Sequence, residues 1–373
     1  MKNIALVMGG FSGEHLVSLG GGQQIYQAID KSKYNVYRIV VGKVLSHNAD
    51  NMLTIDRQQW YWIDPHGAEL PVDRSDFSIT AEGEKVHFDL AFIIVHGNPG
   101  ENGVLQGYFD MLGIPYTTCG FYTSALTFHK GFCNAAVRSF GIVDVAKSVL
   151  LYKVPSDINH TPVTELRYPL FVKPAAGGSS VGTTKVKTSD QLMPAIELAF
   201  KEDTQVMVEE CINGREFDCG VMKIKGKKYV FPITEIIPTE GHEFFDYEAK
   251  YNGFSQEVTP ADVEEPVAKH IQEVSSRLYD LLQCRGVVRF DYIYDVAQRR
   301  LYFLEVNAIP GQSAESIVPK QARAIGITPA QLYQMLIEDA LLEEVGLPSP
   351  TNTTLAKLKA VGGRASQPDQ YDD

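Results

Sequence analysis

Two neighbouring apolar runs decide the fold class of this chain: Val287-Val288-Arg289-Phe290-Asp291-Tyr292 and Leu301-Tyr302-Phe303-Leu304-Glu305-Val306-Asn307. Both are rich in β-branched and aromatic residues, and a short connection joins them, so they predict an antiparallel hairpin. Because side chains alternate faces along a strand, Arg289 and Asp291 share one face of the first strand. By the same alternation, Phe303, Glu305 and Asn307 are expected to share one face of the second.

The acidic and amide side chains of this hairpin predict a metal site. Asp291, Glu305 and Asn307 can converge on a hard, oxygen-liganded cation, and Mg²⁺ bridging nucleotide phosphates is the natural choice. The alternative is a polar, solvent-facing side of a half-exposed sheet. The segment Ala308-Ile309-Pro310-Gly311-Gln312-Ser313 follows directly, and a Pro-Gly turn beyond the acids favours a backbone-lined site.

A glycine- and serine-rich loop lies upstream, Lys173-Pro174-Ala175-Ala176-Gly177-Gly178-Ser179-Ser180-Val181-Gly182. Such a loop can direct backbone N–H groups at phosphate oxygens, and the lysine adds positive charge. It lacks the Gly-Lys-Ser/Thr ending of a Walker A loop, and a strand is expected after it. A flexible hairpin turn is the alternative reading, but the downstream acids favour a flap over a nucleotide.

The order of strand and helix signals indicates α/β and α+β architecture in three domains. The apolar run Ile4–Met8 reads as a buried strand, a helix is expected over about 14–29, and further strands over 36–41 and 90–95. The expected parts are a first α/β domain (1–123, with an insertion at about 44–88), a central subdomain (124–215), a C-terminal subdomain (216–349) and a flexible tail (350–373).

Composition excludes several classes of protein. The chain has 373 residues and a formal net charge of −12, which argues against a nucleic-acid partner because binding to phosphate backbones needs a basic face. The five cysteines are widely spaced without a CxxC, so neither a disulfide framework nor a zinc site is expected. No signal peptide or membrane span is recognised, which predicts a cytoplasmic protein without a membrane partner.

Taken together, the motifs resemble those of the D-alanine–D-alanine ligases of the ATP-grasp superfamily. The resemblance covers about residues 3–345 and is carried by segments in the family's order: Gly9–Ser18, His96-Gly97 with Gly100-Glu101-Asn102-Gly103 and Leu105-Gln106-Gly107, the Lys173 loop, Phe245–Tyr251, Arg289-Phe290-Asp291, Glu305-Val306-Asn307 and Pro310-Gly311.

The resemblance implies a Rossmann-like (pre-ATP-grasp) domain followed by a two-part ATP-grasp fold. It implies ATP-dependent ligation of two D-alanines through an acyl phosphate, for peptidoglycan precursor synthesis and so for cell-wall biogenesis and cell shape. The implied cofactors are ATP and two Mg²⁺ ions, which Mn²⁺ can replace, and the implied assembly is a homodimer.

The resemblance also assigns residues to roles. The catalytic set is Glu14, Ser179, Tyr251, Arg289 and Gly311. ATP would be bound by Lys130, Lys173, Ser180, Glu209, Ile212, Glu216 and Lys250. The D-alanines would be bound by Glu14, His96, Lys250, Arg289 and Ser316. The metal ligands would be Asp291, Glu305 and Asn307.

Three alternative functions compete with this interpretation. A D-alanine–D-lactate ligase, or another ATP-grasp dipeptide ligase, would use the same scaffold, but Tyr251 argues against the lactate enzyme. A non-catalytic nucleotide-binding protein would be expected to have lost a metal ligand or a lysine that binds phosphate, and neither is lost in this sequence. An NAD-dependent oxidoreductase fails because GxGxxG is absent. The chain also departs from its relatives, with Phe245 where they often carry Tyr and with the uncharged run Ala175-Ala176-Gly177.

Overall fold

The first sheet is built around the apolar strand predicted at the N-terminus. A computed structural model of the chain describes residues 1–47, 53–178, 181–238 and 255–342. Strand β1 (Lys2–Gly9) lies in a five-stranded sheet of order β4-β3-β2-β1-β7. It pairs in parallel with β2 (Tyr34–His47) and β7 (Leu90–Ile93), and Ile4 to Val7 are fully buried because both faces of the sheet are covered.

Helix α1 (His15–Ala28) follows β1 and confirms the helix expected over about 14–29. Helix α2 (Val104–Leu112) ends at Gly113, whose left-handed conformation is typical of a helix cap. The segment expected as an insertion at about 44–88 both extends the main sheet and adds a hairpin. Strands β3 (Leu53–Ile63) and β4 (Glu69–Pro71) lie in the main sheet, and β5 (Ile79–Ala81) with β6 (Glu84–Val86) forms the hairpin.

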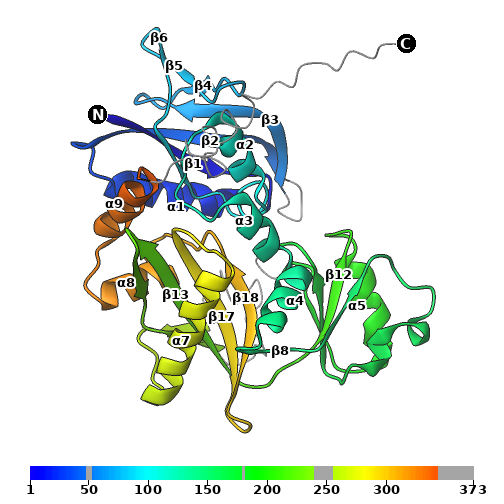
Figure 1. Cartoon of the computed structure of the whole chain (residues 1–373). Coiled ribbons are helices and arrows are strands. Elements are labelled where there is room, and N and C mark those ends of the chain that lie inside the picture. Colours follow the sequence, from blue (N-terminus) through cyan, green and yellow to red (C-terminus); the bar gives the residue numbers. More distant parts are fainter. Residues whose placement is uncertain (48–52, 179–180, 239–254, 343–373) are drawn as a thin grey trace, which may run out of the picture.

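The central part is a four-stranded antiparallel sheet of order β11-β10-β12-β9. Its strands are β9 (Ser148–Leu151), β10 (Leu170–Pro174), β11 (Thr184–Val186) and β12 (Val206–Glu210). Helix α5 (Leu192–Ala199) packs on it, as Figure 1 shows in green. Helices α3 (Phe121–Phe128) and α4 (Lys130–Phe140) precede the sheet, with the three-residue helices η1 (Ile158–His160) and η3 (Ser189–Gln191) and the four-residue helix η2 (Pro162–Glu165) among its strands.

A larger sheet of order β16-β15-β13-β17-β18-β8 forms the C-terminal part, with β14 paired to β13. Its strands are β13 (Arg215–Ile224), β14 (Lys227–Val230), β15 (Thr234–Pro238), β16 (Ser255–Val258), β17 (Val287–Asp295), β18 (Arg300–Asn307) and the short β8 (Asp144–Val145). Its helices are α7 (Glu265–Leu281), α8 (Ile317–Ala324) and α9 (Pro329–Ala340). The predicted hairpin of β17 and β18 is confirmed, and the two strands are antiparallel.

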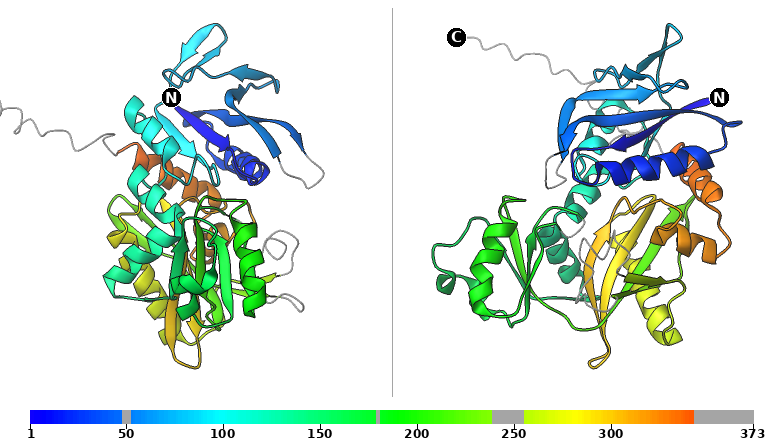
Figure 2. Two further views of the ribbon diagram at one scale, coloured as in Figure 1. Left: turned by 90° about the vertical axis from the view of Figure 1, so that its right-hand side faces the viewer. Right: turned by 180° about the vertical axis from the view of Figure 1, so that it is seen from behind.

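Packing joins parts that are distant in the sequence. Helix α9 lies beside α1 in both views of Figure 2, and the rings of Tyr333 and Phe92 meet edge to face at 5.8 Å between centroids. Strand β8 pairs with β18, and α4 packs on the same strand. The α/β and α+β fold class is confirmed, while the predicted domain bounds stay a prediction. Ser179, Ser180, Lys250, Tyr251, Phe245 and the 350–373 tail lie outside the described residues.

Candidate functional site

A cavity of about 590 Å³ opens where the three parts meet. Every predicted site residue that the structure describes lines it, although these residues come from sequence positions as much as 302 apart. They are Glu14, His96, Lys130, Lys173, Glu209, Ile212, Glu216, Arg289, Asp291, Glu305, Asn307, Gly311 and Ser316. A single cavity therefore collects the residues that the motifs marked out.

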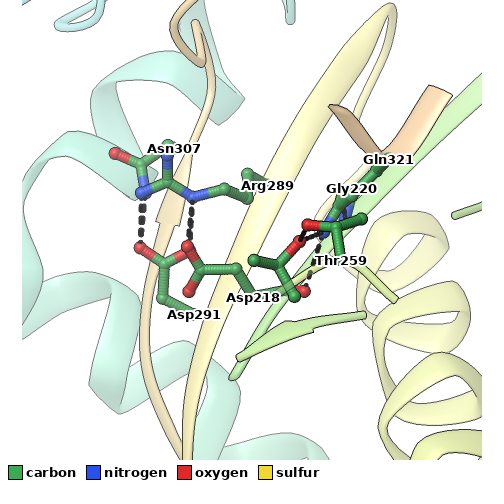
Figure 3. Close-up of polar contacts among 8 residues, drawn as sticks. Asp218, Gly220, Thr259, Arg289, Asp291, Asn307 and Gln321 are labelled. Atoms are coloured by element: carbon green, nitrogen blue, oxygen red, sulfur yellow. Dashed lines mark hydrogen bonds and ion pairs between the residues drawn. The ribbon is translucent and has the colours of Figure 1, made fainter. Parts of the chain in front are cut away.

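The floor of the cavity is a row of acidic side chains across three adjacent strands. Asp291 of β17 is paired in register with Glu305 of β18 and, on its other side, with Asp218 of β13. Arg289 lies on the same strand as Asp291 and forms an ion pair with it. Its Nε and Nη2 donate to the two carboxylate oxygens at 2.8 Å each. Asn307 Nδ2 donates to the same carboxylate at 2.9 Å (Figure 3).

The expectation that Phe303 shares a face with Glu305 is wrong. The register shifts after Asp291, so that Asp291 is opposite Glu305 but Tyr292 is opposite Phe303, and Leu304 is the extra residue of a β-bulge. Phe303 is therefore turned into the core, where its ring packs against Tyr292 at 6.2 Å. The bulge lets both Leu304 and Glu305 line the cavity.

Two lysines bring positive charge to the cavity. Lys130 is the first residue of α4, and its Nζ lies 3.0 Å from Glu305 and donates to the carbonyl of Gly177 at 2.8 Å. Burial lowers the pKa of Lys130, but the nearby acids, Glu305 first and then Glu101 and Glu209, together raise it overall, so the ammonium stays charged. Lys173 on β10 is ion-paired with Glu209 on β12, and both are nearly buried.

Glu14 lies where the first helix meets the glycine loop. It is the N-cap residue of α1, at the start of the helix expected from about residue 14, yet its side chain does not cap the helix. Instead it lies so close to Gly178 that a Cβ on that glycine would approach Glu14 Oε2 to 2.5 Å. Its proposed partners Ser179 and Tyr251 lie outside the described residues.

Two groups of the first part, the buried His96 and the half-buried Glu101, line the same cavity as this carboxylate. Burial lowers the pKa of His96, while Glu14 opposes the shift. The N–H of Gly97 donates to Glu101 Oε2 at 2.7 Å, yet burial, with Glu14 and Glu305 adding to it, raises the pKa of Glu101 to about 8.

The Pro-Gly turn beyond β18 completes the cavity wall. Gly311 lies against Ser316, the N-cap residue of α8, because a Cβ on the glycine would meet Ser316 Oγ at 2.8 Å. The Ser316 hydroxyl accepts from the N–H of Ser313 at 3.0 Å, which fixes the turn. The Gly311 backbone is thereby presented to the cavity without a side chain in the way.

Two residues of the site were not predicted. Glu101 occurs in the quoted Gly100-Glu101-Asn102-Gly103 motif, which was a signal, but no role was assigned to it. Asp218 follows Glu216 by two residues on β13, so the two acids share one face of the strand, and this spacing is a weaker sequence signal. Its place beside Asp291 depends on the pairing of β13 with β17, which are about 70 residues apart.

The donor set fits a hard divalent cation. Asp291 and Glu305 supply carboxylates and Asn307 an amide oxygen, which are ligands that Mg²⁺ accepts. Each carboxylate is neutralised by a cationic side chain, Asp291 by Arg289 and Glu305 by Lys130. Within the described ranges, no three His, Cys, Asp or Glu side chains alone form a metal-binding group, so the amide of Asn307 is needed to complete the set.

Comparison with known proteins places the chain in a family. Models of the D-Ala-D-Ala ligase family match residues 3–119 with its N-terminal domain and residues 140–338 with its C-terminal domain. A D-alanine–D-alanine ligase of Phocaeicola vulgatus is 44% identical over 338 residues, covering 91% of this chain and 99% of the relative.

Solved structures agree with this placement. A D-Ala:D-Ser ligase from Enterococcus faecalis is 33% identical with a TM-score of 0.77, covering 90% of this chain and 98% of the other. A D-alanine–D-alanine ligase from Bacillus anthracis complexed with ATP is 27% identical with a TM-score of 0.69, covering 91% and 98%.

The fold and the site define an ATP-grasp ligase, in which two α+β parts enclose a cavity above a row of acids. More narrowly, the chain belongs to the D-alanine–D-alanine ligase family.

Proposed function

We propose that the chain joins two D-alanines into D-alanyl-D-alanine at the expense of ATP, for the synthesis of peptidoglycan precursors. The observation that carries the proposal is the convergence of Glu14, two lysines, Arg289 and the acidic row on one cavity. Membership of the family and the 44% identity to a D-alanine–D-alanine ligase support it.

In the first step, the carboxylate of one D-alanine attacks the γ-phosphorus of ATP, forming an acyl phosphate and releasing ADP. Lys130 and Lys173 would hold the phosphates, with Ser180 and Lys250 as further ATP ligands. Glu209 and the backbone of Ile212 would contact adenine, and Glu216 the ribose. Charge stabilisation dominates catalysis of phosphoryl transfer, so buried lysines suit the task.

Asp291, Glu305 and Asn307 would hold two Mg²⁺ ions, with Mn²⁺ as a substitute. Bound there, the metal would supply neutralisation of the phosphate charge. The residue chemistry supports this, since Asp291 and Glu305 offer carboxylate oxygens and Asn307 an amide oxygen to the same cavity.

In the second step, the amine of the other D-alanine attacks the acyl carbon, and phosphate leaves from the tetrahedral species. Arg289 and the N–H of Gly311 would stabilise its oxyanion, because fixed donors act most strongly where charge develops. Glu14 would bind the ammonium group of the first D-alanine, near His96. Ser316 and Lys250 would bind the carboxylate of the second.

Glu14 would also form a hydrogen-bonded set with Ser179 and Tyr251. The set would close the 242–253 loop over the intermediate and exclude water, which would otherwise hydrolyse the acyl phosphate.

We infer that the enzyme works in the cytoplasm as a homodimer. Along the described residues, every helix is too short or too polar to cross a membrane.

The test is a phosphate-release assay with ATP, Mg²⁺ and D-alanine, followed by mass spectrometry of the product. Release with D-alanine but not with L-alanine, and a product of the mass of the dipeptide, would support the proposal. D-serine and D-lactate are run beside D-alanine across pH, because the similar Enterococcus faecalis structure is a D-Ala:D-Ser ligase. A clear preference for either would overturn the assignment of the second substrate.

A further inference from the structure

Asp218 is a buried acid in the floor of the cavity to which the proposed mechanism gives no task. It is 1% exposed and is paired in register with Asp291 on the neighbouring strand. Its Oδ2 lies 3.1 Å from Arg289 Nε, and its Oδ1 accepts no hydrogen bond from any residue that the structure describes. A buried carboxylate that is only partly satisfied is costly, so its position calls for a reason.

The backbone that carries Asp218 is held rigidly by a buried glutamine. Gln321 Nε2 donates to the carbonyl of Asp218 at 2.9 Å, and the N–H of Gly220 donates to Gln321 Oε1 at 2.9 Å. The same Nε2 donates to Thr234 Oγ1 at 3.0 Å, and Thr234 shares a 2.7 Å hydrogen bond with Thr259 (Figure 3). This network fixes β13 at the level of Asp218, so its carboxylate is a preorganised group.

Arg289 therefore lies between two carboxylates. Asp291 holds its Nε and Nη2, while Asp218 approaches the same Nε from the adjacent strand. Burial and the neighbouring Asp291 raise the pKa of Asp218 well above its usual range, and Arg289 opposes the shift. Without Asp218, the guanidinium would lose its contact with the second carboxyl group and would be held by Asp291.

A divalent cation on Asp291 changes this balance. It repels the nearby guanidinium and competes for the lone pairs of Asp291, so the grip of Asp291 on Arg289 weakens. Asp218 cannot follow the metal, because its strand is pinned by Gln321. Asp218 therefore stays in place and keeps the Arg289 guanidinium directed toward the substrate.

We propose that Asp218 is a positioning residue: its carboxylate retains Arg289 in the site while Asp291 binds the divalent cation. The inference rests on the proposed function for the role of Arg289, but the contact of Asp218 with Arg289 concerns this chain's own residues and can be tested without turnover.

The experiment uses the full chain carrying Asp218→Asn, which preserves shape and removes the charge. Mn²⁺ binding in the presence of ADP, without D-alanine, is measured by electron paramagnetic resonance of the free ion. Steady-state kcat and KM are measured in parallel. The matched control is Asp144→Asn, whose carboxylate accepts from Arg300 Nε at 2.8 Å in an exposed pair at the far end of β18.

We expect Asp218→Asn to weaken Mn²⁺ binding about fivefold or more, because Arg289 then competes more strongly with the ion for Asp291. The kcat should fall at least about tenfold while KM for ATP changes less than about threefold, since Arg289 acts on the tetrahedral species. The control should leave all three quantities unchanged.

A double variant separates positioning from a purely structural role. In an Arg289→Lys background, Asp218→Asn should cause little further loss of kcat, because its effect passes through Arg289. Additive losses, or wild-type Mn²⁺ affinity and kcat in Asp218→Asn, would overturn the proposal. If Asp218→Asn does not fold, Asp218→Thr is measured in its place. A wild-type chain that makes no dipeptide would refute the proposed function, and the Mn²⁺ measurement would still decide the contribution of Asp218.

Discussion

Replacement of Asp291 by alanine tests the acidic row most directly. The substitution removes the acceptor of three hydrogen bonds, two from Arg289 at 2.8 Å and one from Asn307 at 2.9 Å. It also removes a proposed metal ligand. Stability and activity should therefore respond to very different degrees.

The loss of stability is limited by Asp218. Removing one partner of a buried ion pair typically costs about 3–5 kcal/mol, because the other charge is left alone. Here Arg289 keeps Asp218 at 3.1 Å, and the repulsion between the two aspartates disappears. We therefore expect a loss of only about 1–3 kcal/mol, which leaves the protein folded.

Turnover should fall far more. Metal-assisted charge stabilisation contributes several kcal/mol to such reactions, so a loss of at least about 1000-fold, or about 4 kcal/mol, is expected. Urea unfolding gives the first quantity and phosphate release the second, with Asp144→Ala as the control. A folded Asp291→Ala protein that keeps more than about a tenth of wild-type turnover would refute the reasoning.

Three further perturbations probe other parts of the molecule. Gly178→Ala should raise KM for D-alanine with the fold intact, since the new Cβ would press on Glu14 at 2.5 Å; an unchanged KM would contradict this placement. With EDTA present, unfolding free energy should fall as pH rises from about 4.5 to 8, because folded Glu101 keeps its proton up to about 8 whereas the unfolded carboxyl ionises near 4.5. Urea titrations at several pH values measure the slope of the unfolding free energy against pH. Glu101→Gln should flatten this slope, and an unaltered slope would contradict the prediction. Tyr333→Ala should cost about 3–5 kcal/mol, against about 1 kcal/mol for Tyr333→Phe, which loses only the hydroxyl donating to Gln312 O at 3.0 Å; equal losses in urea unfolding would show that ring packing on Phe92 is unimportant.

The elements of the fold could be predicted because their signals are local. A continuous apolar run marked β1, and alternating side chains marked β17. The bulge at Leu304 could not be predicted, since nothing in a single strand shows where its partner gains a residue. That one residue sends Phe303 to the core and leaves Glu305 beside Asp291.

The sequence by itself predicted thirteen residues that line the cavity, because the motifs keep their residue types and order along the chain. Only the tertiary structure decided which of them touch. Lys130 meets Glu305, and Asp218 stands beside Asp291, through pairings between segments about 175 and 70 residues apart. Charges separated by that much chain interact only once the sheets have formed, so their pairing, and the task it gives to Asp218, is a property of the fold.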